Sequence, residues 1–166
     1  MPEILDLYDK DGNRTGETVV RGTKIPAGRH VLLVSIVTLN SRGEILLTRR
    51  AAGKTFEGCW EVTGGCVQAG ENALQGAVRE LFEETGIRTA AEELECRGKK
   101  TGRDFIHSFY LLRRDVPVHA LWLSADETEA AKWVQPAEYM RLTEQYRTIP
   151  LGVSLLREYY PDLFCE

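Results

Sequence analysis

Three glutamates, at positions 80, 83 and 84, lie within five residues after Arg79 in the sequence. On a helix, with about 100° per residue, Glu83 and Glu84 fall about 60° and 40° to either side of Glu80, so one edge carries all three carboxylates. Each exposed like-charge pair at this spacing destabilises a helix by roughly 0.2–0.5 kcal/mol. A divalent cation would relieve this repulsion, and carboxylate oxygens suit Mg²⁺ or Mn²⁺. The pattern indicates a metal site, with a solvated helix face as the alternative.

The element that must position these acids is a helix from Glu71 or Asn72 to Thr85. Gly86 suits its C-terminal cap. The side chains expected on its buried face share one side of the helical wheel. They are Leu74, Ala77, Val78, Leu81 and Thr85. The acidic edge adjoins this face, so we expect it to border the protein core.

Strand patterns surround this helix on both sides. Runs rich in β-branched and aromatic residues, bounded by turn residues, predict the strands. They are Ile4–Tyr8, Thr18–Val20, His30–Leu39, Ile45–Arg49, Trp60–Thr63, Leu94–Lys99, Phe105–Arg113 and Ala130–Val134. Pro136–Gln145 and Leu151–Tyr160 are predicted to be helices. We expect hairpins at the first two pairs and at Leu94–Arg113, in a mixed α/β sandwich whose strand order is left open.

The composition fits one compact domain with a sizeable core. The chain has 166 residues, of which 43% are hydrophobic, and a formal net charge of −4. The small acidic excess disfavours general nucleic-acid binding, and no apolar run or leader-like segment predicts a membrane span or export. The spacing of the cysteines fits neither a zinc site nor a disulfide framework, so we expect reduced thiols and a cytoplasmic protein. The cysteines are Cys59, Cys66, Cys96 and Cys165.

The stretch from Gly65 to Ile87 resembles the signature of the Nudix family at every defined position. It reads Gly65, five residues, Glu71, seven residues, Arg79-Glu80-Leu81, one residue, Glu83-Glu84, one residue, Gly86-Ile87. The resemblance extends from about Leu32 to Met140. It implies a Nudix-type α/β/α sandwich with a mixed central sheet and one catalytic helix. We expect a single domain over residues 1–166, with residues 1–29 as an N-terminal hairpin extension and residues 65–87 as the Nudix box.

The resemblance also implies a metal-dependent pyrophosphohydrolase that cleaves a nucleoside diphosphate linked to another moiety. Glu83 and Glu84 would be the main ligands of Mg²⁺ or Mn²⁺, with Glu80 and the Gly64 carbonyl contributing. Arg79 would orient a carboxylate through charge-assisted hydrogen bonds. Glu71 would not bind the metal itself, but it would hold the loop and the start of the helix in place.

Further candidates lie outside the box. Glu127, in the acidic segment that precedes Trp133, is the favoured further ligand or base, and Glu129 is the second choice; the identity of the general base stays open between them and the box acids. Arg49 and Arg50 could hold a phosphate, or they could form an ordinary charged strand end. The expected partner is a small diphosphate, with neither nucleic acid nor membrane, and a homodimer is compatible with the sequence.

Two alternatives remain within the same resemblance. The segments Leu5–Asp9 and Leu47–Ala51 are similar to the isopentenyl-diphosphate isomerase branch. That enzyme requires a Cys and a metal-binding His around the first glycine of the box, where this chain has Gly64 and Cys66. The second alternative is a non-catalytic nucleotide-binding module, which is disfavoured because every acid of the box is present.

Overall fold

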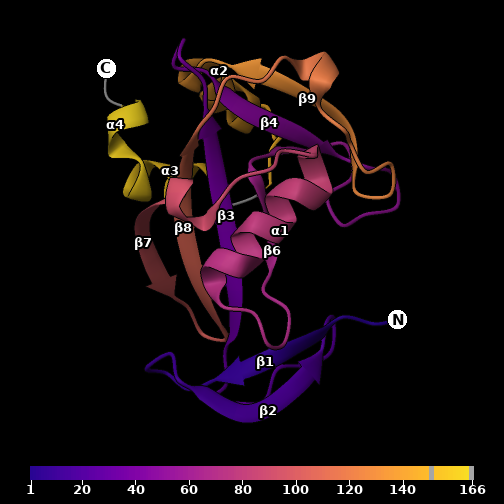
Figure 1. Ribbon diagram of the computed structural model, residues 1–166, viewed down its shortest axis with the longest axis vertical. Coiled ribbons are helices and arrows are strands. Elements are labelled where there is room, and N and C mark those ends of the chain that lie inside the picture. The colour runs from indigo at the N-terminus through magenta and orange to yellow at the C-terminus, as the bar shows by residue number, and fades with distance from the viewer. Residues whose placement is uncertain (150–151, 165–166) are drawn as a thin grey trace.

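The computed structural model describes residues 1–149 and 152–164, and its central feature is a mixed sheet with helices on both faces (Figure 1). This confirms the expected α/β/α sandwich. The strands of the sheet are β3 (Val31–Leu39), β4 (Ile45–Arg50), β5 (Trp60–Glu61), β6 (Thr63–Cys66), β7 (Glu95–Thr101), β8 (Phe105–Arg113) and β9 (Thr128–Val134). The helices are α1 (Ala73–Thr85), α2 (Pro136–Glu144), α3 (Gly152–Tyr159) and α4 (Pro161–Phe164), with short 3₁₀ turns at Ala91–Glu93 and Val118–Ala120.

The sheet runs in the order β5-β4-β3-β8-β7, with β6 also pairing with β3 and β9 with β4. The central pair is parallel: β3 and β8 stay in register from Val31 opposite Phe105 to Leu39 opposite Arg113. The expected hairpin of β3 and β4 forms, but its one registered pair is Leu39 with Ile45. Beyond that point, β3 pairs with β6, and β4 pairs with β5 and β9.

The prediction of a single strand over Trp60–Thr63 is wrong, because β3 and β4 separate after the pair Leu39 and Ile45. The segment divides at Val62 into β5, which pairs with β4, and β6, which pairs with β3 and continues to Cys66. A single straight strand cannot pair along both partners once they separate, because hydrogen-bonded strands must stay about 4.8 Å apart. The bend at Val62 brings the two glycines at positions 64 and 65 alongside β3.

Each face of the sheet has its own core, because successive strand residues point to opposite sides. Val34 and Ile36 of β3 pack with Leu81 of α1 on one face. Val37 and Leu39 pack with Tyr139, Leu142, Leu156 and Tyr160 of the C-terminal helical region on the other face. Thus α1 is held against the sheet by its apolar side, as its sequence predicts.

The N-terminal strands β1 (Ile4–Tyr8) and β2 (Arg14–Val20) form a separate two-stranded hairpin below one end of α1 (Figure 1). The return strand begins at Arg14 and not at Thr18, because Tyr8 already pairs with Arg14 beyond a register shift. Leu5 and Leu7 pack on Val31 in a third small core.

Other expectations concern the termini and the thiols. None of the described helices is long and apolar enough to cross a membrane. Cys59, Cys66 and Cys96 are free thiols, whereas Cys165 lies outside the described residues. The helix expected over Leu151–Tyr160 is observed from Gly152 to Tyr159, and Leu151 lies outside the described residues.

Candidate active site on the central helix

The helix α1 is closed at both ends by local interactions. Asn72 caps its start: the Asn72 side chain accepts from the Gln75 amide at 2.9 Å, and the Gln75 side chain accepts from the Asn72 amide at 2.8 Å. At the other end Gly86 has a left-handed φ of 73° and donates to the Phe82 carbonyl. These caps fix where the helix begins, so Glu71 lies in the preceding loop, just outside the helix.

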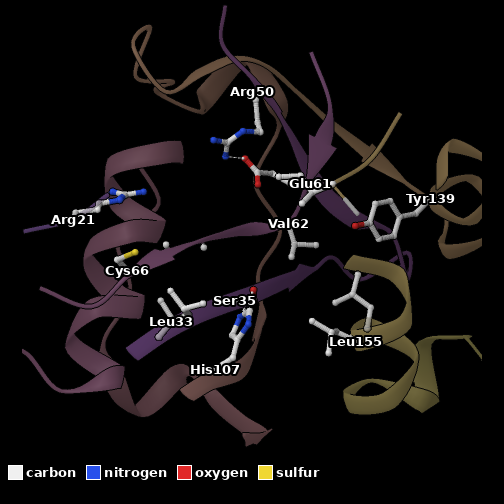
Figure 2. A pocket seen from close by; sticks show the side chains of 15 residues that line it. Arg21, Leu33, Ser35, Arg50, Glu61, Val62, Cys66, His107, Tyr139 and Leu155 are labelled. Carbon is white, nitrogen blue, oxygen red and sulfur yellow. Dashed lines mark hydrogen bonds and ion pairs between the residues drawn. The ribbon is translucent and has the colours of Figure 1, made fainter. Parts of the chain in front are cut away.

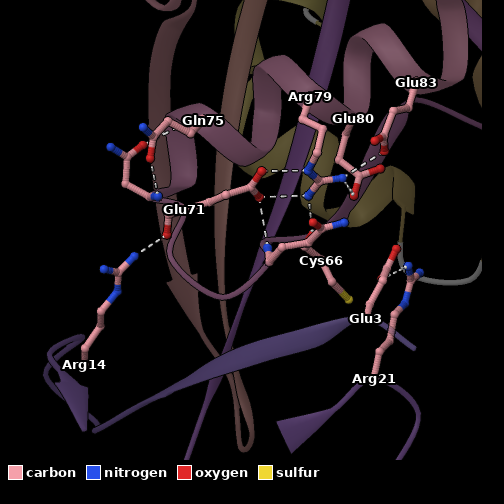
Figure 3. A network of polar contacts seen from close by, with 11 residues as sticks. Glu3, Arg14, Arg21, Cys66, Glu71, Gln75, Arg79, Glu80 and Glu83 are labelled. Carbon is pink, nitrogen blue, oxygen red and sulfur yellow. Dashed lines mark hydrogen bonds and ion pairs between the residues drawn. The ribbon is translucent and has the colours of Figure 1, made fainter. Parts of the chain in front are cut away.

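Arg79 is the centre of the polar network in Figure 3. Its guanidinium donates to both carboxylate oxygens of Glu71, at 2.8 and 3.0 Å, and to Glu80 and Glu83 at 2.9 Å each. A further bond at 2.9 Å reaches the Cys66 carbonyl. Glu71 also accepts from the Gln68 amide at 3.0 Å. Arg79 therefore ties the loop, the strand β6 and two acids of the helix together.

Two of the three helix acids lie below the surface. Glu80 and Glu84 are each only 8% exposed, while Glu83 is exposed. Burial raises the pKa of Glu80, against the opposing effect of Arg79. Burial raises the pKa of Glu84 well above its ordinary value, and the neighbouring carboxylates of Glu61, Glu80 and Glu127 raise it further. The cluster is thus short of positive charge at its buried end.

Two glycines of β6 allow close packing at the site, one against a helix acid and one against β3. A Cβ on Gly65 would lie 2.3 Å from Oε1 of Glu80, and one on Gly64 would lie 2.4 Å from the backbone oxygen of Val34. Any larger residue at position 65 would therefore displace the carboxylate. The Gly-Gly pair of β6 lets the acidic side of α1 approach the sheet directly.

The buried end of this cluster fits a divalent cation. Oε2 of Glu84 is buried and lacks a hydrogen-bond partner, which is a costly state for a carboxylate oxygen and one that a metal ion would relieve. Within the described part of the chain no three acidic, His or Cys side chains already converge as a complete metal site. Glu80 and Glu83 are turned toward Arg79, so they would have to reorient to share an ion with Glu84.

The acids line a cavity of about 480 Å³ that also contains cations. It is bordered by Glu3, Arg21, Arg50, Gly53, Lys54, Thr55, Gly64, Glu80, Glu83, Glu84 and Glu127. A second cavity, of about 310 Å³, lies beside it on the α3 face of the sheet (Figure 2). Arg21, Arg50 and Gly64 border both cavities. The two cavities therefore adjoin at these residues, and together they are called the cleft; two arginines stand at its junction, each paired with a glutamate.

The structure distinguishes Arg49 from Arg50, which the sequence left as joint candidates for a phosphate contact. Arg50 lines the cleft and forms an ion pair with Glu61 at 2.8 Å, whereas Arg49 pairs with Glu129 at 3.0 Å and borders neither cavity. Glu127 borders the acidic cavity beside Lys54. The pairing of β4 with β9 shifts register between Arg49 and Arg50, at the point where the two side chains take different partners.

Sequence reasoning missed several residues of this cleft. Glu61, one residue before the bend at Val62, faces the second cavity, and burial raises its pKa despite the Arg50 partner. Ser35 and His107 meet there at 2.8 Å across the parallel strand pair (Figure 2). Burial lowers the pKa of His107 to about 4, so this pair is uncharged at neutral pH. Val62, where β5 and β6 are separated, borders the same cavity, so simple strand alternation does not predict which side chains line it.

Comparisons with known proteins agree with this geometry. A family model described as NUDIX domain matches residues 29–151. The chain is 26% identical over 150 residues to an uncharacterised Nudix hydrolase of Listeria monocytogenes, covering 89% of each protein. It is 35% identical over 118 residues to the CTP pyrophosphohydrolase of Escherichia coli, covering 70% of this chain and 82% of that protein.

A crystal structure of a Deinococcus radiodurans protein has a similar fold. Its TM-score is 0.79 at 22% identity, over 95% of this chain and 99% of that one. At this identity the likeness bears on the fold alone.

Proposed function

The chain belongs to the Nudix family of hydrolases, and from this premise we propose that the cleft beside α1 cleaves the diphosphate bond of a nucleoside diphosphate linked to another group. Nudix hydrolases generally depend on a divalent cation. The buried, unpartnered Oε2 of Glu84, beside the buried Glu80, is the observation that carries the proposal. It supports a site that is electrostatically incomplete until a cation binds.

The proposed ligands are the carboxylates of Glu80, Glu83 and Glu84, with the Gly64 carbonyl as a further oxygen. Oxygen donors of this kind favour Mg²⁺ or Mn²⁺ over softer metals. A bound cation would neutralise charge on the diphosphate oxygens and lower the pKa of an attacking water.

Arg79 and Glu71 are proposed to hold the metal-binding carboxylates in position without contacting the reacting atoms. Burial alone would raise the pKa of Glu71, but the hydrogen bonds from Arg79 and the Gln68 amide outweigh it and lower that pKa. Glu71 therefore stays ionised and holds Arg79 in position. Arg79 in turn sets the position of Glu80 and Glu83 through single hydrogen bonds that a cation can replace.

Glu127 is the proposed base or additional ligand, since it borders the acidic cavity opposite the helix acids. Its neighbour Lys54 can neutralise it in the absence of substrate. Arg50, held by Glu61 and the Thr55 carbonyl, is the proposed phosphate contact. The second cavity, with its apolar walls and the uncharged Ser35–His107 pair, is the proposed site of the organic part of the substrate.

Hydrolysis of a substrate panel tests this function. The panel contains CTP, ADP-ribose, other nucleoside diphosphate sugars, dinucleoside polyphosphates and isopentenyl diphosphate, each with Mg²⁺, Mn²⁺ or EDTA. We expect cleavage of at least one nucleotide that EDTA abolishes. Isomerisation of isopentenyl diphosphate without hydrolysis, or tight nucleotide binding without turnover, would overturn the proposal.

A further inference from the structure

The N-terminal hairpin brings one cation into the cleft. Arg21 directly follows β2 and borders both cavities, although it precedes the part of the chain that the family model matches. In Figure 2 its side chain points in beside Cys66, and in Figure 3 it lies below Glu80 with Glu3. This residue therefore belongs to the cleft in space but to a different segment in sequence.

The hairpin is attached to the loop that leads into α1. The Ala69 amide donates to the Ile4 carbonyl at 2.8 Å, and the Gly70 amide donates to the Asp6 carboxylate at 2.9 Å. Arg14 donates to the Glu71 carbonyl from the other strand of the hairpin. Because these contacts join the hairpin to the same loop that holds Glu71, the position of Arg21 is fixed relative to the helix acids.

The charges of the cleft show where an anion can be accepted. The acidic cavity is lined by five glutamates and three cations, so most of its wall repels a diphosphate. Lys54 is paired with Glu127, and both side chains are partly exposed. Arg21 and Arg50 instead lie where the two cavities meet. A substrate whose organic group lies in the second cavity and whose diphosphate reaches the helix acids in the acidic cavity must span this junction.

The Arg21 guanidinium is suited to such a contact. Its side chain is 48% exposed and donates through Nη1 to Glu3 at 2.6 Å. Among the described residues, the guanidinium donates to Glu3. A guanidinium has five N–H donors in a planar fork that matches phosphate oxygens. Glu3 itself borders the acidic cavity and would compete with an anion for this group.

Resting on the proposed hydrolase function, we propose that Arg21 is a substrate-binding residue that holds the diphosphate opposite Arg50. The hairpin is then part of the active site, and Glu3 holds the guanidinium in place until an anion replaces it. The competing explanation is that Arg21 and Glu3 form only a structural ion pair at the end of the hairpin. The two explanations differ in the effect expected when Glu3 loses its charge.

The test measures binding of methylenediphosphonate, a diphosphate mimic that cannot be hydrolysed, by calorimetry in the presence of Mg²⁺. Arg21→Ala should raise the Kd at least five-fold. The matched control is Arg29→Ala: Arg29 belongs to the same N-terminal extension and pairs with Glu17 at 2.5 Å, but it borders neither cavity. It should leave the Kd within two-fold. Equal affinities of the wild type and Arg21→Ala would overturn the proposal.

A second variant keeps the test informative if Arg21→Ala weakens the hairpin, which a thermal melt would reveal. Glu3→Gln removes the competing carboxylate and retains Arg21, so it should tighten methylenediphosphonate binding at least two-fold. A purely structural pair predicts weaker binding in both variants, and that result would overturn the proposal. A wild-type protein that binds the diphosphonate but hydrolyses no member of the panel would contradict the proposed function and not the role of Arg21.

Discussion

The carboxylate of Glu71 accepts two hydrogen bonds from the guanidinium of Arg79, at 2.8 and 3.0 Å, and both side chains are largely buried. This two-point contact joins the loop before α1 to the middle of the helix. It also leaves one nitrogen of Arg79 to contact Glu80 and Glu83. The position of the proposed metal ligands therefore depends on a residue that need not touch the metal.

Substituting Glu71 with Gln should lower stability and, to a smaller extent, activity. One bond from Arg79 would lose its charged acceptor, at a cost of about 1–3 kcal/mol in the free energy of unfolding. We expect a kcat reduction of roughly ten-fold, since the ligands stay in place but lose their fixed orientation. Urea unfolding and hydrolysis rates of Glu71→Gln measure both effects. An unchanged stability would contradict the role given to this pair.

The acids Glu83 and Glu84 should differ in their effects on the metal-free protein. Both Glu83→Gln and Glu84→Gln should reduce Mg²⁺-dependent hydrolysis by at least two orders of magnitude. In EDTA, however, Glu84→Gln should raise Tm by about 2–4 °C, equivalent to about 1 kcal/mol, because a buried charge is removed. Glu83 is exposed, so its substitution should change Tm little. A lower Tm of Glu84→Gln in EDTA would argue against a site left incomplete without metal.

Glu127, in the turn before β9, and Glu129, near the start of β9, offer a matched comparison. Glu127→Gln should reduce kcat at least ten-fold if it acts as the base or as a ligand, since general base catalysis contributes about 10²–10⁴-fold. Glu129→Gln should stay within two-fold, because Glu129 pairs with Arg49 away from the cleft. Steady-state kinetics at saturating Mg²⁺ measures both. Equal effects of the two substitutions would leave the helix acids as the candidates for the base.

The two glycines of β6 should respond differently to a methyl group. Gly65→Ala would force the Glu80 carboxylate, a flexible group, to move, so it should weaken Mg²⁺ binding and lower kcat at least ten-fold with little change in stability. Gly64→Ala would collide with the backbone of β3, so it should destabilise the fold by about 1–3 kcal/mol. Metal titration followed by thermal shift, together with urea unfolding, separates the two. A fully active Gly65→Ala would show that Glu80 is not needed in its present place.

His107 should make the fold less stable as the pH falls. Burial lowers its pKa to about 4, so between its ordinary pKa and that value the unfolded chain binds a proton that the folded protein does not. Stability from this residue is present above about pH 6.5 and is lost on acidification, by about 2 kcal/mol between pH 7 and pH 5. The buried glutamates act in the opposite direction, so the wild type alone is not informative. Comparing His107→Gln with the wild type at both pH values isolates the effect: the stability difference between the two proteins should change by about 2 kcal/mol.

The sequence by itself determined the parts of the molecule that depend on local order. The period of the apolar residues, the cap residues and the spacing of the acids identified α1, its buried face and the family. Strand patterns located the strands to within a few residues, except at Trp60–Cys66 and at the start of β2. These features are set by neighbours a few residues away, so the sequence contains the information directly.

The tertiary structure alone decided which side chains meet. The parallel pairing of β3 with β8 joins Ser35 to His107, and the separation of β3 from β4 bends the chain at Val62. The sequence left Arg49 and Arg50 as joint candidates for a phosphate contact, and the tertiary structure placed only Arg50 at the cleft. Arg21 reaches the site only because the hairpin docks on the loop before α1. Such contacts join residues that are far apart in the chain. Which residues meet depends on how whole faces of the sheet and helices are buried, and local sequence patterns do not predict this.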